Sequence, residues 1–214
     1  MNEQFSFMVA FILQGLGLTL KVYAVTIIFS IPLGIICAIG KVSKFKPLVW
    51  LLDIYTWVFR GTPLLLQLIF AYFGLPLLGI EFSQENAAYI TFILNYGAYF
   101  TEIFRAGIES IDKGQYEAAK VLGMSYGQTM RRIIIPQALK VVIPPTGNEA
   151  VTLIKDTALC SAIALSELLK NSKDMVSKFA SIDGFVIAAI IYLILTFVII
   201  QIFKLIEKRF RYYS

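Results

Sequence analysis

The organisation of the chain is decided by residues 117–136, EAAKVLGMSYGQTMRRIIIP. This segment is polar, basic and rich in helix-forming residues, yet it lies between apolar runs that are long enough to span a membrane. Short loops with an excess of Lys and Arg lie on the cytoplasmic side of a membrane. The sequence therefore predicts a cytoplasmic loop against which another component docks.

The composition is typical of an integral membrane protein. Of the 214 residues, 58% are hydrophobic and 15% are charged, and the mean hydropathy is +0.75, whereas a soluble domain carries about 25% charged residues. The net charge of +5 matters through its placement in loops, so we expect no nucleic-acid partner. The N-terminal MNEQFSF has an acid and no basic segment, which does not fit a cleaved signal peptide.

Several functional classes are disfavoured by what the sequence lacks. It has no histidine and no GxxxxGK[ST] sequence, so we expect neither histidine-based catalysis nor ATP binding by a P-loop. Cys37 and Cys160 lie in separate apolar segments without other metal ligands nearby, and we interpret them as inert packing residues. We predict that the chain is not an enzyme, holds no metal or cofactor, and depends on another subunit for energy.

The apolar runs predict an all-α, polytopic membrane protein, a single domain of residues 1–214 with five transmembrane helices. An interfacial helix over residues 4–20 comes before the first span, residues 22–40, and Lys41, Lys44 and Lys46 mark the cytoplasmic end of that span. The N-terminus is then outside. The other predicted spans begin near residues 48, 86, 141 and 184, with external segments at residues 75–85 and 161–183. The basic residues Lys204, Lys208, Arg209 and Arg211 predict a cytoplasmic C-terminus.

Two spans contain features that a plain membrane helix does not need. In the second span, the sequence Arg60-Gly61-Thr62-Pro63 predicts either backbone opened toward a polar cavity or a simple proline kink with Arg60 reaching polar surface. In the third span, residues 86–108, one helical face carries Asn95, Tyr99, Glu102 and Ala106. An acid within a span marks a pathway or a paired site, and Arg105 offers Glu102 a partner.

The loop and the fourth span are also unusual. We expect a helix over residues 115–122, a stop at Gly123, and a second helix over residues 124–135 that ends at Pro136. The adjacent prolines Pro144 and Pro145 predict a fourth span made of broken or short helices. Lys155 and Asp156 are consecutive, so each needs a different partner, and one of them fits an internal salt-bridge network.

Five sequence blocks together resemble one known family. Glu117-Ala118-Ala119, then Gly123 and Pro136, match the EAA loop, about residues 112–140, of permease subunits of bacterial ATP-binding-cassette (ABC) importers, although Ile135 stands where the family usually has Leu. The blocks are FRGTPLLLQ (59–67), EIFRAGIESI (102–111), KGQYEAAKVLG (113–123), IIIPQAL (133–139) and LIKDTALCSAI (153–163). They resemble the polar amino acid branch of that family, which includes histidine, glutamine and arginine permeases.

The resemblance implies the type I ABC importer permease fold and a location in the bacterial cytoplasmic (inner) membrane. It implies three protein partners: an ATPase subunit that binds ATP and Mg, a second permease subunit, identical or related, and an extracytoplasmic solute-binding protein. It also implies that residues 117–123 form a coupling helix, in which Ala118, Ala119 and Gly123 permit close approach and Glu117 makes polar contacts. The alternative for this segment is a plain amphipathic surface helix, which does not explain the Gly and Pro spacing.

We predict that the solute is a polar amino acid. Candidate contacts are Glu102, Asn95 and Asp156 for its charged ends, with Thr62 and Thr157 as hydroxyl partners. Two acids within the membrane favour a basic amino acid. Alternatives are the same importer class with a different solute, a channel or secondary carrier, although carriers usually contain internal repeats that are not visible here, and a membrane scaffold without a transport role.

Overall fold

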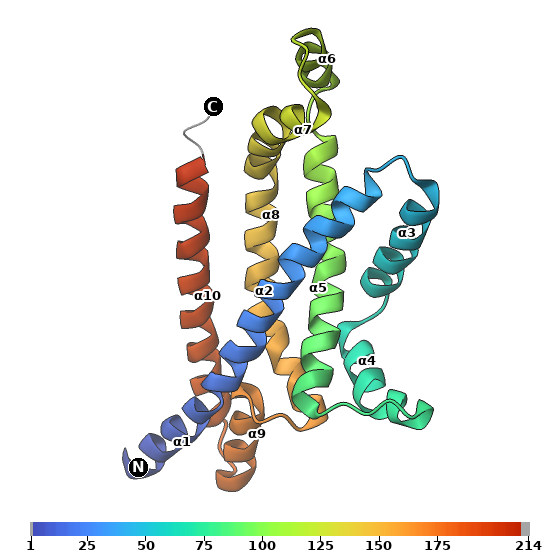
Figure 1. Cartoon of the computed structure of the whole chain (residues 1–214). Helices are drawn as coiled ribbons and strands as arrows, with labels where there is room; N and C mark the ends of the chain where they lie inside the picture. Colours follow the sequence, from blue (N-terminus) through green and yellow to red (C-terminus); the bar gives the residue numbers. More distant parts are fainter. Residues whose placement is uncertain (1, 211–214) are drawn as a thin grey trace.

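The computed structural model describes residues 2–210, in which every regular element is a helix (Figure 1). The α-helices are α1 (Asn2–Gln14), α2 (Leu16–Lys41), α3 (Lys46–Gly61), α4 (Leu64–Ile69), α5 (Gln84–Glu109), α6 (Lys113–Val121), α7 (Tyr126–Thr129), α8 (Ile135–Asp156), α9 (Leu168–Phe179) and α10 (Asp183–Phe210). Two π-helical turns, η1 (Phe70–Gly74) and η3 (Met130–Ile134), and two 3-10 helices, η2 (Leu75–Leu78) and η4 (Thr157–Ile163), complete them. Arg211 lies outside the described residues.

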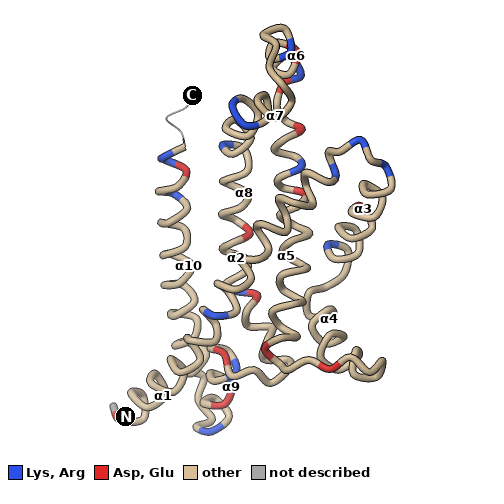
Figure 2. The backbone as a smooth tube through the Cα atoms, viewed as in Figure 1, with Lys and Arg blue, Asp and Glu red and all other residues tan. Residues whose placement is uncertain are grey.

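The long helices α2, α5, α8 and α10 form the body of the molecule, with α2 running obliquely across α5 and α8 (Figure 1). The contact between α2 and α5 is the most extensive, and the core around it contains Phe92, Tyr96 and Phe100. Helix α6 protrudes at one end, where α10 also finishes, while α1 and α9 lie at the opposite end (Figure 1). Basic residues lie along the α6 and α7 end and along the turn between α2 and α3 (Figure 2).

Not every predicted span meets a strict test of length and composition. Within the described residues, two stretches are long and apolar enough to cross a membrane, Glu3–Lys41 and Asp183–Phe210. The pair Lys46–Gly61 and Leu64–Leu78 qualifies as a third if it is one bent span. Helices α5 and α8, of 26 and 22 residues, have sufficient length but a more polar composition. Five spans and the orientation of the termini therefore stay predictions.

The boundary expected near Lys21 was placed wrongly, because the helix break falls at Gly15 instead. Lys21 stays within α2, where its Nζ pairs with Glu85 Oε2 at 2.6 Å, so its charge does not end the helix. Gly15 lies where the backbone at Glu167 approaches: an added Cβ there would be 2.5 Å from the Glu167 carbonyl carbon. The joint between α1 and α2 is thus set by close packing and not by a charge.

The break in the second predicted span is real. The helical segments Lys46–Gly61 and Leu64–Leu78 meet at 101°, and Thr62 is extended, with φ −117° and ψ 146°, as expected for a residue before proline. The Phe59 carbonyl, freed by the end of α3, accepts hydrogen bonds from Asn95 Nδ2 and Gln67 Nε2, both at 2.9 Å. This is opened backbone satisfied by neighbouring amides rather than a simple kink.

The first helix of the loop, α6, forms as predicted. The second helix does not end where the sequence predicted. Gly123 adopts φ +71°, and the Met124 N–H bonds to the Ala119 carbonyl at 3.0 Å, which ends α6 in a left-handed C-terminal turn. The prediction that Pro136 ends a second helix was wrong: α7 continues through η3 into α8. Pro136 is the second residue of α8 and follows the π-helical turn η3 without a break, so it lies inside a continuous helical run.

The predicted break at Pro144 and Pro145 was also wrong. Both prolines lie inside α8, which is continuous from Ile135 to Asp156. Helix α8 packs against both α5 and α10, and such lateral support tolerates the two bonds that the prolines remove. The α-helix gives way to a 3-10 helix only after Asp156, where η4 begins.

Candidate functional site

A cavity of about 580 Å³ opens where the α3–α4 break meets α5 and the end of α8. Its size falls in the range of small-molecule sites. The lining residues are Arg60, Gly61, Thr62, Pro63, Leu64, Leu65, Asn95, Tyr96, Tyr99, Glu149, Thr152, Asp156 and Leu159. The cavity therefore combines an opened backbone turn, aromatic rings and both signs of charge.

The acidic wall of the cavity belongs to α8. Glu149, Thr152 and Asp156 are spaced three and four residues apart, so they share one helical face. Asp156 Oδ2 accepts a hydrogen bond from the Tyr96 hydroxyl at 2.7 Å. Among the described residues, neither carboxylate has an ion-pair partner within 4 Å. This wall therefore presents two carboxylates to the cavity.

The cavity lining also includes one cation, Arg60. Arg60 is the last charged residue of α3, and its side chain is 43% exposed. Its guanidinium lies over the Tyr99 ring, 5.5 Å from the centroid, and 3.9 Å from Glu102 Oε2. The aromatic face and the carboxylate hold this cation at the edge of the cavity.

Three of the five predicted solute contacts lie in the cavity wall: Thr62, Asn95 and Asp156. Thr62 Oγ1 donates to the Val58 carbonyl at 2.8 Å and accepts from Gln67 Nε2 at 2.7 Å. Asn95 is 4% exposed, and its Nδ2 donates to the Phe59 carbonyl. The polar groups of Thr62 and Asn95 are thus already engaged in holding the broken turn.

The structure places the other two predicted contacts outside the cavity. Thr157 is fully buried, and its hydroxyl donates to the Ile154 carbonyl at 2.7 Å. Glu102 pairs with Lys41 of α2 and, through Oε2, with Arg105 at 2.8 Å. The pairing with Arg105 that the sequence offered is therefore present, and a second cation joins it.

Sequence reasoning left out part of the cavity. Glu149 and Thr152 were visible as polar residues of the fourth span, and their spacing from Asp156 was the signal that would have grouped them. Arg60 was noted only as part of the break at residues 60–63, and the α3–α4 bend is what brings it next to α5, whereas Tyr96 gave no comparable signal.

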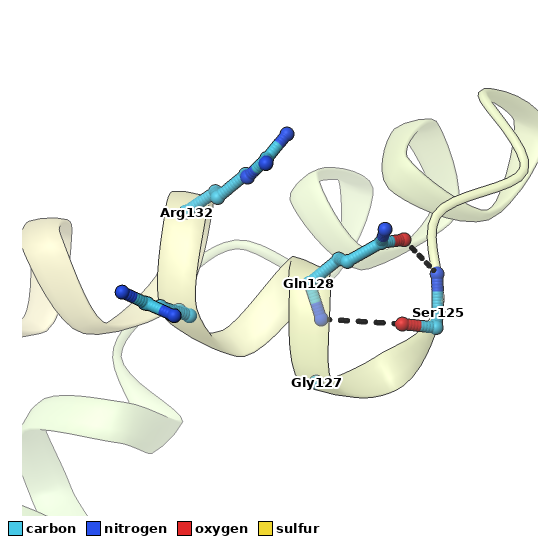
Figure 3. Close-up of a pocket in the computed structure, with 5 residues that line it drawn as sticks. Ser125, Gly127, Gln128 and Arg132 are labelled. Carbon is cyan, nitrogen blue, oxygen red and sulfur yellow. Dashed lines mark hydrogen bonds between the residues drawn. The ribbon is translucent and has the colours of Figure 1, made fainter.

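The predicted coupling segment forms the tip of the molecule. Helix α6 extends beyond the ends of the neighbouring helices (Figure 1). Val121 and Leu122 are 87% and 77% exposed, whereas Ala119 is buried. A shallow depression beside it is lined by Ser125, Gly127, Gln128, Arg131 and Arg132. Figure 3 shows Ser125 and Gln128 bonded to each other, backbone to side chain in both directions, at 2.8 and 3.4 Å.

Comparison with known proteins identifies the class to which this fold belongs. Residues 30–212 match the family model described as binding-protein-dependent transport system inner membrane component. The chain therefore belongs to this family, and its resemblance to amino acid permeases of ABC importers is confirmed.

Individual relatives are similar over nearly their whole length. The chain is 42% identical to the arginine transport system permease protein ArtQ of Bacillus subtilis (strain 168), covering 95% of this chain and 94% of that protein. It is 40% identical to the putative glutamine transport system permease protein GlnP of Rickettsia bellii (strain RML369-C), covering 96% and 95%. The crystal structure of an amino acid ABC transporter with histidines matches with a TM-score of 0.87 and 35% identity, covering 94% of each chain.

Proposed function

We propose that the chain is the membrane permease subunit of an ATP-driven importer for polar amino acids, and that it favours cationic ones. The observation that carries this proposal is the charge set of the cavity: Glu149 and Asp156, which have no ion-pair partner among the described residues, and one cation, Arg60. A cationic amino acid has two ammonium-type groups and one carboxylate, which is the complementary set. The names of the relatives support an amino acid as solute.

The solute contacts follow from this charge set. Arg60 receives the solute's carboxylate, since a guanidinium matches a carboxylate in two parallel bonds. Glu149 and Asp156 receive the cationic groups, and the aromatic faces of Tyr96 and Tyr99 support the stem between them. Asn95 and Thr62 form part of the cavity wall. Glu102 and Thr157 lie outside the cavity and act through the residues that line it.

Coupling to ATP hydrolysis is assigned to the EAA loop, residues 112–140. Exposed Val121 and Leu122 at the tip supply apolar contact for an ATPase subunit. Glu117 lies on the exposed side of α6, while Ala118, Ala119 and Gly123 keep the helix slim and its end sharply turned. Pro136 lies in the first turn of α8, which continues from α7 through η3, so a displacement of the loop is transmitted into the helix that carries Glu149 and Asp156.

The partners follow from this division of labour. ATP and Mg are held by the ATPase subunit, a second permease subunit completes the pathway, and an extracytoplasmic binding protein delivers the solute. The chain crosses the bacterial cytoplasmic membrane five times, with the N-terminus outside and the C-terminus inside. The basic residues around α6, α7 and the α2–α3 turn support this orientation (Figure 2).

The test is uptake into proteoliposomes that contain the assembled importer and one unchanged binding protein. Glu149→Gln and Asp156→Asn should lower the ratio of arginine to glutamine uptake about tenfold, the size expected for one charge-assisted hydrogen bond. Glu109→Gln is the control, because Glu109 pairs with Arg105 on the exposed side of α5 and lies outside the cavity. An unchanged ratio in both cavity variants would exclude the cationic preference.

A further inference from the structure

Lys41 is a buried cation that does not line the transport cavity. It is the last residue of α2, and only 7% of its side chain is exposed. Its Nζ contacts three groups on two other helices: Asp53 Oδ1 at 2.7 Å, Thr56 Oγ1 at 3.0 Å and Glu102 Oε1 at 2.5 Å. A lysine at a helix end normally reaches into water, so this inward position is informative.

Polar contacts join helix α3 to its neighbours at several points. Thr56 is its one buried residue, whereas apolar side chains such as Trp50 and Trp57 are 68% and 76% exposed. The Tyr55 hydroxyl donates to the Leu94 carbonyl at 2.6 Å, and Asn95 holds the Phe59 carbonyl. Leu48 and Leu52 of α3 also pack close to Gly40 of α2, and the polar contacts add directional links that help to fix where α3 lies.

The contacts of Lys41 and the cavity share one side of α3. Asp53, Thr56 and Arg60 are spaced three and four residues apart, so they lie along one helical face. Arg60 approaches the same Glu102 carboxylate that Lys41 binds, through the other oxygen. A shift of α3 at Lys41 would therefore move the Arg60 guanidinium away from α5.

We infer that Lys41 is a positioning residue for transport: it joins Asp53 and Thr56 of α3 to Glu102 of α5 and thereby aims Arg60 into the cavity. Glu102 serves as the anchor of this link and not as a solute contact. The inference rests on the proposed function for its transport consequence, while the link between the helices stands on the contacts alone.

The link can be tested without transport, because both tryptophans of the chain, Trp50 and Trp57, lie on α3. In the purified full-length permease in lipid vesicles, Lys41→Met should raise acrylamide quenching of tryptophan fluorescence, since α3 loosens at this end. Lys41→Arg keeps the charge and the donors, so it should behave as the unchanged protein. Lys44→Met removes an exposed lysine of the same turn and should change nothing.

In the assembled importer, Lys41→Met should reduce uptake about tenfold or more, because it leaves the Asp53 and Glu102 carboxylates facing each other without their shared cation. Lys41→Arg should restore it. Asp53→Asn and Glu102→Gln break the same link, so their effects on uptake should be clearly less than multiplicative when combined. The arginine-to-glutamine ratio of Glu102→Gln should equal that of the unchanged protein.

Each result bears on the inference. It is overturned if Lys41→Met quenches like Lys44→Met, if Lys41→Arg gives no rescue, or if Asp53→Asn and Glu102→Gln combine multiplicatively. A changed solute ratio in Glu102→Gln would make Glu102 a solute contact and overturn the anchor role. If Lys41→Met does not fold, the Asp53→Asn and Glu102→Gln pair gives the decision. Absence of uptake in the unchanged importer would count against the proposed function, and the fluorescence comparison would still judge the link.

Discussion

Gly123 is the residue on which the shape of the coupling loop depends most directly. Its φ of +71° lies in the left-handed region, and no atom of the described residues would lie within 4 Å of an added Cβ. Gly123→Ala therefore strains only the backbone, by about 1–2 kcal/mol. If the turned loop is the form that an ATPase subunit binds, its apparent affinity should fall roughly 5- to 30-fold.

The control for this change is Gly127→Ala. Gly127 is also open to an added Cβ, but it lies in α7 and its φ is outside the left-handed region. Affinity is measured by titrating the purified ATPase subunit onto each permease variant in lipid nanodiscs. Equal affinities for the two variants would show that the turn at Gly123 is not what the ATPase subunit recognises.

Single residues also show what sequence reasoning can reach. Asp156 and Asn95 were found because polar side chains in an apolar segment are conspicuous. Lys41 was interpreted as a marker of the cytoplasmic end, and its inward contacts with Asp53 and Glu102 depend on how two other helices fold back onto it. A one-dimensional pattern contains the residue types but not such pairings between distant helices.

Among the elements, α2 and α5 depend on close approach at one glycine. A Cβ at Gly34 would lie 2.5 Å from Phe100 Cβ and 3.0 Å from the Phe100 carbonyl carbon, and the backbone atom cannot turn away. Gly34→Ala should lower the free energy of unfolding by about 1–3 kcal/mol through overpacking. Gly17→Ala, on the same helix, meets no atom within 4 Å and should be neutral or stabilising by up to about 1 kcal/mol.

These two variants can be compared by thermal unfolding in detergent, followed by circular dichroism. Gly34→Ala should unfold at a lower temperature than the unchanged protein, and Gly17→Ala should not. Similar unfolding temperatures would mean that the contact between α2 and α5 adjusts easily at Gly34.

Helix boundaries were predictable where local chemistry sets them and not where packing does. The α6 stop at Gly123 and the break before Pro63 follow from the backbone preferences of glycine, proline and the residue before proline. Pro144 and Pro145 suggested a broken helix, yet α8 stays continuous because its neighbours support it. The joint at Gly15 depends on the approach of Glu167, which is far away in the sequence.

At the scale of the whole molecule, the proposed orientation predicts which segments can be labelled from each side of the membrane. Ser43 lies in the turn between α2 and α3, and Ser177 lies on the exposed face of α9. A membrane-impermeant maleimide should label Ser177→Cys in intact right-side-out vesicles and Ser43→Cys only in inverted ones. Cys37 and Cys160 are buried and should stay unlabelled. Labelling of both introduced cysteines from one side would contradict the five-span topology.

The class of protein was predictable from five short blocks of sequence, and the family match confirms it. The cavity was predictable only in part, because it forms where the bent pair α3 and α4 folds against α5 and α8. The charge balance of the cavity was not predictable, because it depends on the fold that brings Arg60 into the same cavity as Glu149 and Asp156.

The central claim is that this chain is a conduit whose opening is driven by a separate ATPase through the loop at its tip. Its most direct test measures ATP hydrolysis and labelled arginine uptake in the same proteoliposomes, with and without the solute-binding protein. We predict that both rates rise together when the loaded binding protein is added, and that Gly123→Val abolishes this joint rise. Arginine uptake that continues without the ATPase subunit, or that stays coupled to hydrolysis in Gly123→Val, would contradict the account.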